Sequence, residues 1–164
     1  MSRISRAINH IYIGVDPGKK GGIAFIYPEG CYGAYPMPET RNQVYKLLQE
    51  LKTKYGATLI AAVELVHSMP KQGVASTFTF GKGCGEVLGI LTALDAVIYE
   101  PTPQAWKKVM MAGTDKSKDA AIQVAENLFP DIQLVPKGCR VPNDGIAEAL
   151  LLAEWCHRQF NKGG

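Results

Sequence analysis

The stretch IYIGVDPGKKGGIAFI, residues 11–26, decides the fold class of this chain. Residues 11–16 are apolar and β-branched up to Asp16, which is the pattern of a buried strand. The Pro17-Gly18 pair then predicts a tight turn, and residues 23–27 repeat the strand pattern. Two short strands joined so closely pair in antiparallel fashion, so the chain is predicted to begin with a hairpin.

Beyond this hairpin the sequence alternates between helical and strand patterns. A weaker strand at residues 31–35 is predicted to complete an antiparallel meander. Thr40 and Gln43 have the spacing of a capping box, which starts a helix that Gly56 ends. Further strands are predicted at 59–66 and 96–99, and further helices at 75–94, 104–111, 117–129 and 143–160. Because strands that alternate with helices connect through crossovers, we expect an α/β fold with a mixed sheet.

The composition is that of an ordinary globular protein, with 46% hydrophobic and 20% charged residues. A length of 164 residues fits one core, so residues 1–164 are predicted to form a single domain. No stretch approaches the roughly 18–20 apolar residues that span a bilayer, and the N-terminus lacks the apolar core of a signal peptide. We therefore expect a cytoplasmic protein with no membrane partner. The four cysteines lack C-x-x-C spacing, so no zinc site is predicted.

Four carboxylates stand where folding alone does not require them. Asp16 ends the first strand, and Glu64 interrupts the apolar run LIAAVELV. Glu148 lies in a helix that is apolar on nearly every side, with Asp144 one turn earlier on the same face. A carboxylate in a central strand costs several kcal/mol to desolvate unless it is paired or binds a cation.

Each acid also has a structural interpretation, and these remain open from the sequence alone. Asp16 precedes Pro-Gly and suits a turn, and Asp144 suits the cap or the dipole of a helix start. Taken together, the acids form a set of hard oxygen ligands, which suits Mg²⁺ or Mn²⁺. Two such ions about 4 Å apart are the arrangement that cleaves phosphodiesters.

Four segments resemble the RuvC-like Holliday junction resolvases, in the order and at the spacing of that family. They are residues 11–26, the second block AAVELVHSMPKQGVASTFTFGKGCGEVLGIL, the third block from YEPTPQAWKKVMM through GTDKSKDAAIQVAENLFP, and the last block NDGIAEALLLAEW. The last block is close to the form in phage-encoded members. The resemblance implies an RNase H-like α/β fold, with a mixed five-stranded sheet flanked by helices. It also implies a crossover junction endodeoxyribonuclease that resolves four-way DNA junctions in recombination and repair.

In such an enzyme, paired metal-dependent hydrolysis leaves 5′-phosphate and 3′-hydroxyl ends, and the nearly two-fold symmetry of a junction calls for a homodimer. The resemblance assigns the catalytic and metal-binding roles to Asp16, Glu64, Asp144 and Glu148, with two Mg²⁺ or Mn²⁺ ions per site. Members usually space the last pair of acids three residues apart, whereas here the spacing is four. Whether Asp144 or Glu148 contacts the metal more directly therefore stays open.

DNA contacts are predicted from the basic turns and helix starts of the matching segments. A lysine in the third block is placed to neutralise charge on the transition state. The family often carries a junction-opening aromatic after the second acid, where this chain has His67, so the opening residues stay open. The predicted DNA-binding residues are Lys19, Lys20, His67, Lys71, Lys107, Lys108, Lys116 and Lys118.

Three other functions compete with junction resolution. VDPGKKGGIAF also resembles the phosphate-binding hairpin of actin and sugar kinases, but that fold needs two such domains and a longer chain. A non-catalytic nucleic-acid-binding module is disfavoured by the intact acids. A related nuclease acting on hybrid, flap or other branched substrates is the strongest alternative, because a fold does not set the substrate.

The glycine-rich helix after Glu64 is the predicted dimer interface. Gly81, Gly83 and Gly85 each cost about 1 kcal/mol relative to alanine in a helix, so a close approach would justify them. The alternative is that they let this helix pack tightly on its own sheet.

Overall fold

A computed structural model describes residues 9–66 and 73–163 of the chain, and it contains a five-stranded sheet. The strands are β1 His10–Asp16, β2 Gly22–Tyr27, β3 Cys31–Pro36, β4 Thr58–Val63 and β5 Val97–Tyr99. They lie in the order β3-β2-β1-β4-β5. Strands β3, β2 and β1 pair antiparallel, whereas β4 pairs in parallel with both β1 and β5. The mixed sheet predicted from the sequence is therefore confirmed.

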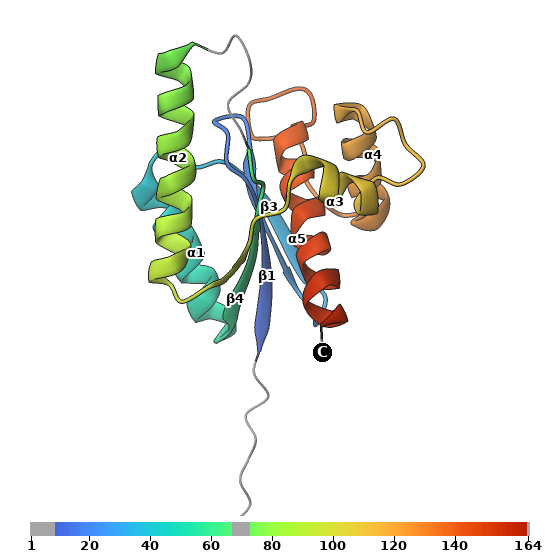
Figure 1. Cartoon of the computed structure of the whole chain (residues 1–164). Coiled ribbons are helices and arrows are strands. Elements are labelled where there is room, and N and C mark those ends of the chain that lie inside the picture. Colours follow the sequence, from blue (N-terminus) through green and yellow to red (C-terminus); the bar gives the residue numbers. More distant parts are fainter. Residues whose placement is uncertain (1–8, 67–72, 164) are drawn as a thin grey trace, which may run out of the picture.

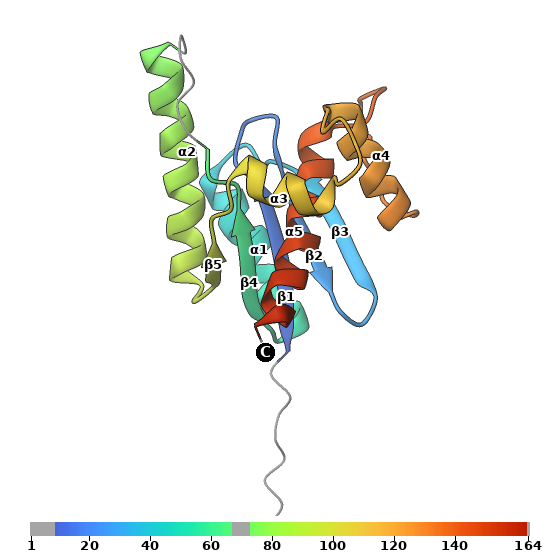
Figure 2. The same cartoon turned by 45° about the vertical axis from the view of Figure 1, so that its right-hand side comes forward.

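Helices cover both faces of this sheet. Their bounds are α1 Arg41–Tyr55, α2 Val74–Ala93, α3 Pro103–Met110, α4 Lys118–Leu128 and α5 Asp144–Lys162. Helices α1 and α2 pack on one face, and α3, α4 and α5 lie on the other (Figures 1 and 2), each side with its own buried apolar core. In the described part of the chain, no helix has the length and apolar character needed to traverse a bilayer.

Capping side chains fix the starts of α1 and α5. Thr40 and Gln43 form the expected capping box on α1, and Gly56 ends that helix in a left-handed conformation with φ 52°. Asn143 caps α5 by accepting a hydrogen bond from a backbone amide of the first turn. The interpretation of Asp144 as the cap of this helix is therefore wrong, because Asp144 is already its first helical residue.

The fourth strand is shorter than its sequence pattern indicates. The apolar run predicts a strand over residues 59–66, but β4 ends at the residue before Glu64. The amide of Glu64 still donates to the carbonyl oxygen of Val15 at 3.1 Å, and that of Leu65 donates to the carbonyl oxygen of Pro101 at 2.8 Å. Glu64 therefore lies at the carboxyl end of the strand rather than within it.

Helix α5 approaches β1 and the turn that follows it so closely that side chains are excluded at two positions. A Cβ atom on Gly14 would lie 1.9 Å from the carbonyl oxygen of Ala149, and one on Gly145 would lie 2.1 Å from the carbonyl oxygen of Lys20. Glycine is required at such positions because another backbone occupies the space of a side chain. The contact places the first turns of α5 beside the end of β1.

The glycines of α2 have no such packing reason within the described fold. A Cβ atom on Gly81, Gly83 or Gly85 would meet no atom within 4 Å. The alternative that these glycines allow tight packing of α2 on its own sheet is therefore wrong.

Replacing a glycine with alanine should affect stability in opposite directions at the crowded Gly14 and at the open Gly83. Gly14→Ala is expected to lower the free energy of unfolding by about 3 kcal/mol, because α5 must move away from β1. Gly83→Ala is expected to raise it by up to about 1 kcal/mol, because alanine is the better helix former and the space is open. Urea denaturation followed by circular dichroism measures both, and equal stability of the two variants would contradict the packing of α5 described above.

Candidate active site

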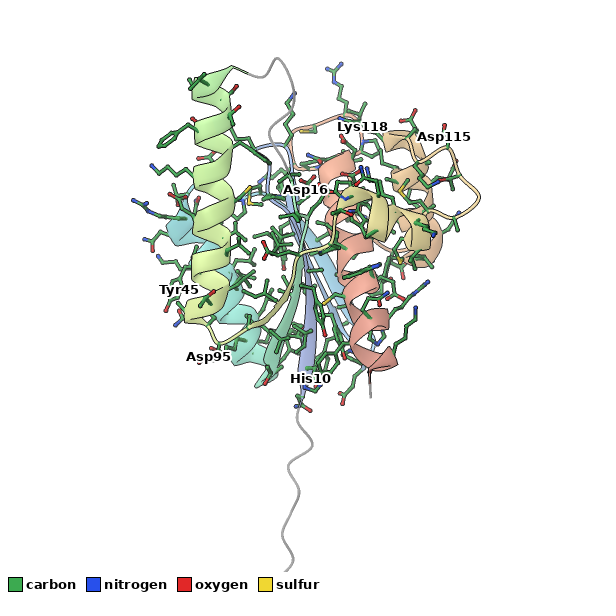
Figure 3. The ribbon with its side chains drawn as sticks, in the orientation of Figure 1. His10, Asp16, Tyr45, Asp95, Asp115 and Lys118 are labelled. Atoms are coloured by element: carbon green, nitrogen blue, oxygen red, sulfur yellow. The ribbon has the colours of Figure 1, made fainter. Side chains whose placement is uncertain are left out.

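Two of the candidate acids meet at the carboxyl ends of neighbouring strands. Asp16 is the last residue of β1, and Glu64 directly follows β4, the strand parallel to β1. The backbone of Glu64 is bonded to Val15, the residue before Asp16. Figure 3 shows Asp16 and Lys118 toward one end of the molecule and His10 at the other. The carboxyl ends of parallel strands are where α/β proteins commonly place their sites.

The other two acids come from the first turns of α5, and their charges reach Asp16. Burial raises the pKa of Asp16 to about 7, and repulsion from Glu64, Glu148 and Asp144 adds to the increase. A hydrogen bond from the Gly18 backbone opposes the rise. The four acids predicted from the sequence therefore form one electrostatic cluster.

Glu64 is the most enclosed of these acids, at 8% exposed. Burial raises its pKa, and a hydrogen bond donated by the indole Nε1 of Trp106, 2.8 Å from Oε1, counteracts this increase. The charge of Glu148 also raises the pKa of Glu64, whereas Lys107 lowers it. Sequence reasoning missed this role of Trp106, because no local pattern connects residues 42 positions apart.

Two of the predicted lysines neutralise the acids on α5. Lys107 from α3 forms an ion pair with Glu148 at 2.5 Å, and both side chains are largely buried. Lys118 from the start of α4 pairs with Asp144 at 3.0 Å in a more exposed position, and this hydrogen bond raises the pKa of Lys118. Each acid on α5 is thus paired with one lysine, Glu148 in an enclosed position and Asp144 in a more exposed one.

Among the described residues, the other lysines predicted to contact DNA form no ion pair with the four acids. Lys19 and Lys20 are in the exposed turn between β1 and β2, next to Asp16. Lys108 and Lys116 are exposed and form no ion pair with any described residue. His67 and Lys71 lie outside the described residues.

The acids suit a hard cation by their chemistry, although their present arrangement is not that of a complete metal site. Within residues 9–66 and 73–163, no three carboxylate, imidazole or thiolate side chains are arranged to hold a metal ion. Two of the four carboxylates are directed at lysines instead. The repulsion among four oxygen-ligand side chains nevertheless fits Mg²⁺ or Mn²⁺, which would relieve it.

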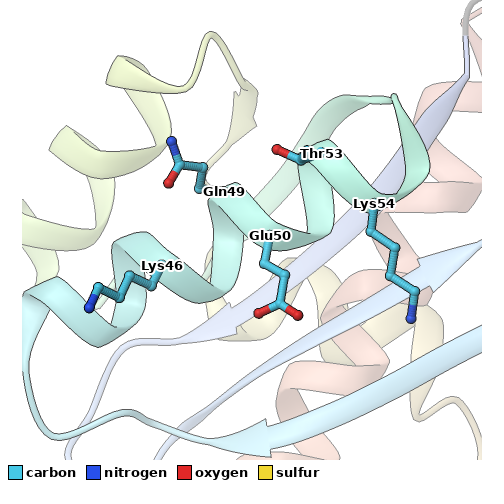
Figure 4. A pocket seen from close by; sticks show the side chains of 5 residues that line it. All are labelled: Lys46, Gln49, Glu50, Thr53 and Lys54. Atoms are coloured by element: carbon cyan, nitrogen blue, oxygen red, sulfur yellow. The ribbon is translucent and has the colours of Figure 1, made fainter.

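Two hollows lie on the surface of the described fold. One lies on the outer side of α1 (Figure 4), and its lining residues all belong to that helix, remote in sequence and structure from the acids. The other, of about 900 Å³, lies between α2 and the segment leading into α1. Its lining includes Pro17 and Lys19 from the turn that follows Asp16.

Comparison with known proteins identifies related sequences and folds. No protein-family model matches the chain. The chain is 31% identical over 97 residues to the chloroplastic Holliday junction resolvase MOC1 of Chlamydomonas reinhardtii. That match spans 59% of this chain and 11% of the length of the algal protein.

Two solved structures share the fold of this chain over almost its entire length. Thermus thermophilus RuvC in complex with a Holliday junction substrate has a TM-score of 0.62 at 16% identity, covering 94% of this chain and 96% of that one. The yeast mitochondrial Holliday junction resolvase Ydc2 has a TM-score of 0.52 at 13% identity, covering 99% of this chain and 86% of that one. These likenesses show the RNase H-like fold of RuvC, as the sequence predicts.

The cluster makes the stability of the metal-free protein dependent on pH through Asp16. Its pKa is about 7 in the fold against an ordinary value of 3.8 for an aspartate, so between these values the folded state keeps a proton that the unfolded state has lost. Stability should therefore fall as pH rises through this window. Asp16→Asn should raise the free energy of unfolding above pH 7 by roughly 2–4 kcal/mol and change it little near pH 4.

Urea denaturation in the presence of a chelator, at about pH 4 and about pH 8, measures this effect. Asp95→Asn is the matched control, because Asp95 is exposed and lies far from Asp16 (Figure 3), and asparagine tolerates its φ of 55°. The same pH dependence in wild type and Asp16→Asn would show that burial and the neighbouring acids do not raise the pKa of Asp16 in the folded protein.

Proposed function

We propose that this chain is a metal-dependent Holliday junction resolvase of the RuvC-like type, which acts in DNA recombination and repair. The supporting observation is the cluster of Asp16, Glu64, Asp144 and Glu148, at the position where two strands end and α5 begins. The RuvC fold and the sequence similarity to a protein named as a junction resolvase support the same substrate. We also propose that residues 1–164 act as a single endonuclease domain in the cytoplasm, similar to phage-encoded members.

The acids would hold Mg²⁺ or Mn²⁺, two ions per site, which supply positive charge at the phosphodiester and favour ionisation of the attacking water. The chain's own contribution is to gather the four carboxylates at one end of the sheet, where burial and mutual repulsion raise the pKa of Asp16 and of Glu64 and a cation would restore their ionised form. Lys107 and Lys118 are bound to acids that the cations would neutralise. Their ammonium groups would then turn to the phosphate and stabilise the charge that develops as the bond breaks. Hydrolysis leaves a 5′-phosphate and a 3′-hydroxyl.

Cleavage of defined substrates tests this function. The protein is incubated with a labelled four-way junction, a flap, a linear duplex and an RNA–DNA hybrid, with Mg²⁺ and with chelator. We expect paired nicks in the junction, none with chelator, and little cutting of the other substrates. Asp16→Asn should lose cleavage but keep junction binding, because the amide removes charge at nearly constant shape, while Asp95→Asn should cut normally. Preferential cutting of the flap or hybrid would assign the alternative nuclease function.

We further propose that the active protein is a homodimer formed through the outer face of α2. Val74 and Phe78 are 88% and 73% exposed, and they share a helical face with Gly81, Gly85 and Gly89. The open space around these glycines leaves room for a second backbone. A two-fold axis there would present two equivalent acidic clusters to a nearly symmetric junction.

A substitution that introduces a charge on the outer face of α2 tests this interface. Gly85→Glu should convert a dimer at micromolar concentration into a monomer without loss of helical structure, because glutamate is a better helix former than glycine. Gln123→Glu makes the same charge change on an exposed position of α4 and should leave the dimer intact. Sedimentation velocity reports the mass of each variant, and an unchanged dimer in Gly85→Glu would place the interface elsewhere.

A further inference from the structure

Trp106 is a fully buried residue of α3 whose polar atom is directed at the acidic cluster. Its exposed fraction is 0%, and its indole Nε1 donates to Oε1 of Glu64 at 2.8 Å. An indole has a single N–H, accepts no hydrogen bond in its ring plane and does not titrate. It therefore satisfies one oxygen of Glu64 without adding a charge, in contrast to the lysines that bind Asp144 and Glu148.

Residues 101–106 contact the chain just after β4 twice, once through a backbone hydrogen bond and once through the Trp106 side chain. The carbonyl oxygen of Pro101 accepts the amide of Leu65 at 2.8 Å, and Trp106 follows one turn into α3. The start of α3 is fixed by Thr102, whose side chain accepts from the Ala105 amide. Residues 101–106 thus hold the backbone of Leu65 through Pro101 and the carboxylate of its neighbour Glu64 through Trp106, which restricts the rotation of that carboxylate.

Trp106 also contacts the second part of the cluster. The Nζ atom of Lys107 lies 5.2 Å from the centroid of the Trp106 ring, within the range of a cation–π contact. Lys107 in turn binds Glu148. One indole therefore supports Glu64, just after β4, through its N–H and, through its ring face and Lys107, Glu148 on α5.

We propose that Trp106 is a positioning residue for the cation site, which fixes Glu64 so that its second oxygen is presented to a divalent cation. This inference rests on the proposed function, because it concerns the same four acids. A buried ligand that is held before the cation arrives loses less conformational freedom on binding, and partners of this kind typically change metal affinity by about 10- to 100-fold. The neutral donor matters because it leaves the charge of Glu64 for the cation.

The chain offers a matched control in its second tryptophan. Trp155 is on α5, and its Nε1 atom is buried without a hydrogen-bond partner among the described residues. Its ring packs edge-on against Tyr99, at a centroid distance of 6.3 Å. Trp155→Phe therefore removes an indole N–H of comparable burial that has no acidic partner.

Metal affinity without DNA is the measurement that tests the proposal. Mn²⁺ is titrated into metal-free wild type, Trp106→Phe and Trp155→Phe in a calorimeter, and thermal unfolding of each is recorded. We expect Trp106→Phe to bind Mn²⁺ about tenfold more weakly or worse, and Trp155→Phe to bind as wild type does. In cleavage assays Trp106→Phe should need more metal for half-maximal rate, with most of the rate recovered at saturation. Unchanged or tighter Mn²⁺ binding by Trp106→Phe overturns the proposal, even if its unfolding temperature falls.

A second measurement uses the unmodified protein, so it stands if Trp106→Phe does not fold. The chain has two tryptophans, so a ¹H–¹⁵N spectrum contains two indole N–H signals, which Trp155→Phe assigns. Mg²⁺ should shift the Trp106 signal and leave that of Trp155 in place. No movement of the Trp106 signal at saturating Mg²⁺ overturns the proposal. Because neither measurement contains DNA, a protein that binds metal as expected but leaves junctions uncut would refute the proposed function and keep this inference.

Discussion

The close contact between α5 and β1 is the constraint on which the acidic cluster depends. A side chain at Gly14 would collide with the backbone of Ala149 in α5, and one at Gly145 would collide with the carbonyl of Lys20, so either would displace α5. Either displacement would move the first turns of α5 away from the end of β1. The acids on the helix would then no longer influence the pKa of Asp16 as they do. The glycines at positions 14 and 145 therefore set the distance between the acids at the strand ends and the acids on α5.

The cost of this arrangement is electrostatic. Four carboxylates share one end of the sheet. Burial, together with the repulsion from the other three acids, raises the pKa of Asp16 to about 7. Within the described fold the compensation comes from two lysines and one indole, none of which bonds directly to Asp16. Such a concentration of like charge weakens the folded state and is retained where a site needs it. A cation is the partner that would relieve all four at once.

Much of the fold was predictable from local patterns, whereas the pairing of side chains was not. Apolar, β-branched runs, the Thr40 capping box and the Pro17-Gly18 turn each act over a few residues, so the strands, helices and mixed sheet could be predicted from them. The end of β4 was predicted too late because Leu65 and the residue after it are as apolar as the residues of the strand. The chain leaves the sheet there, where the amide of Leu65 bonds to the distant Pro101. The partners of Glu64 and Glu148 are 42 and 41 residues away, beyond any sequence period.

The unequal surroundings of the two acids on α5 bear on which of them is central to the site. Glu148 contributes more than Asp144 to raising the pKa of Asp16, and Glu148 also raises the pKa of Glu64. Its side chain is 12% exposed and that of its partner Lys107 is 22% exposed, against 34% and 77% for Asp144 and Lys118. An exposed ion pair contributes about 0–1 kcal/mol, so Asp144 is released at little cost, whereas Glu148 already faces the other acids. Of the two acids on α5, Glu148 is therefore the more enclosed and the more strongly coupled to Asp16 and Glu64, whereas Asp144 lies at the more exposed side of the cluster.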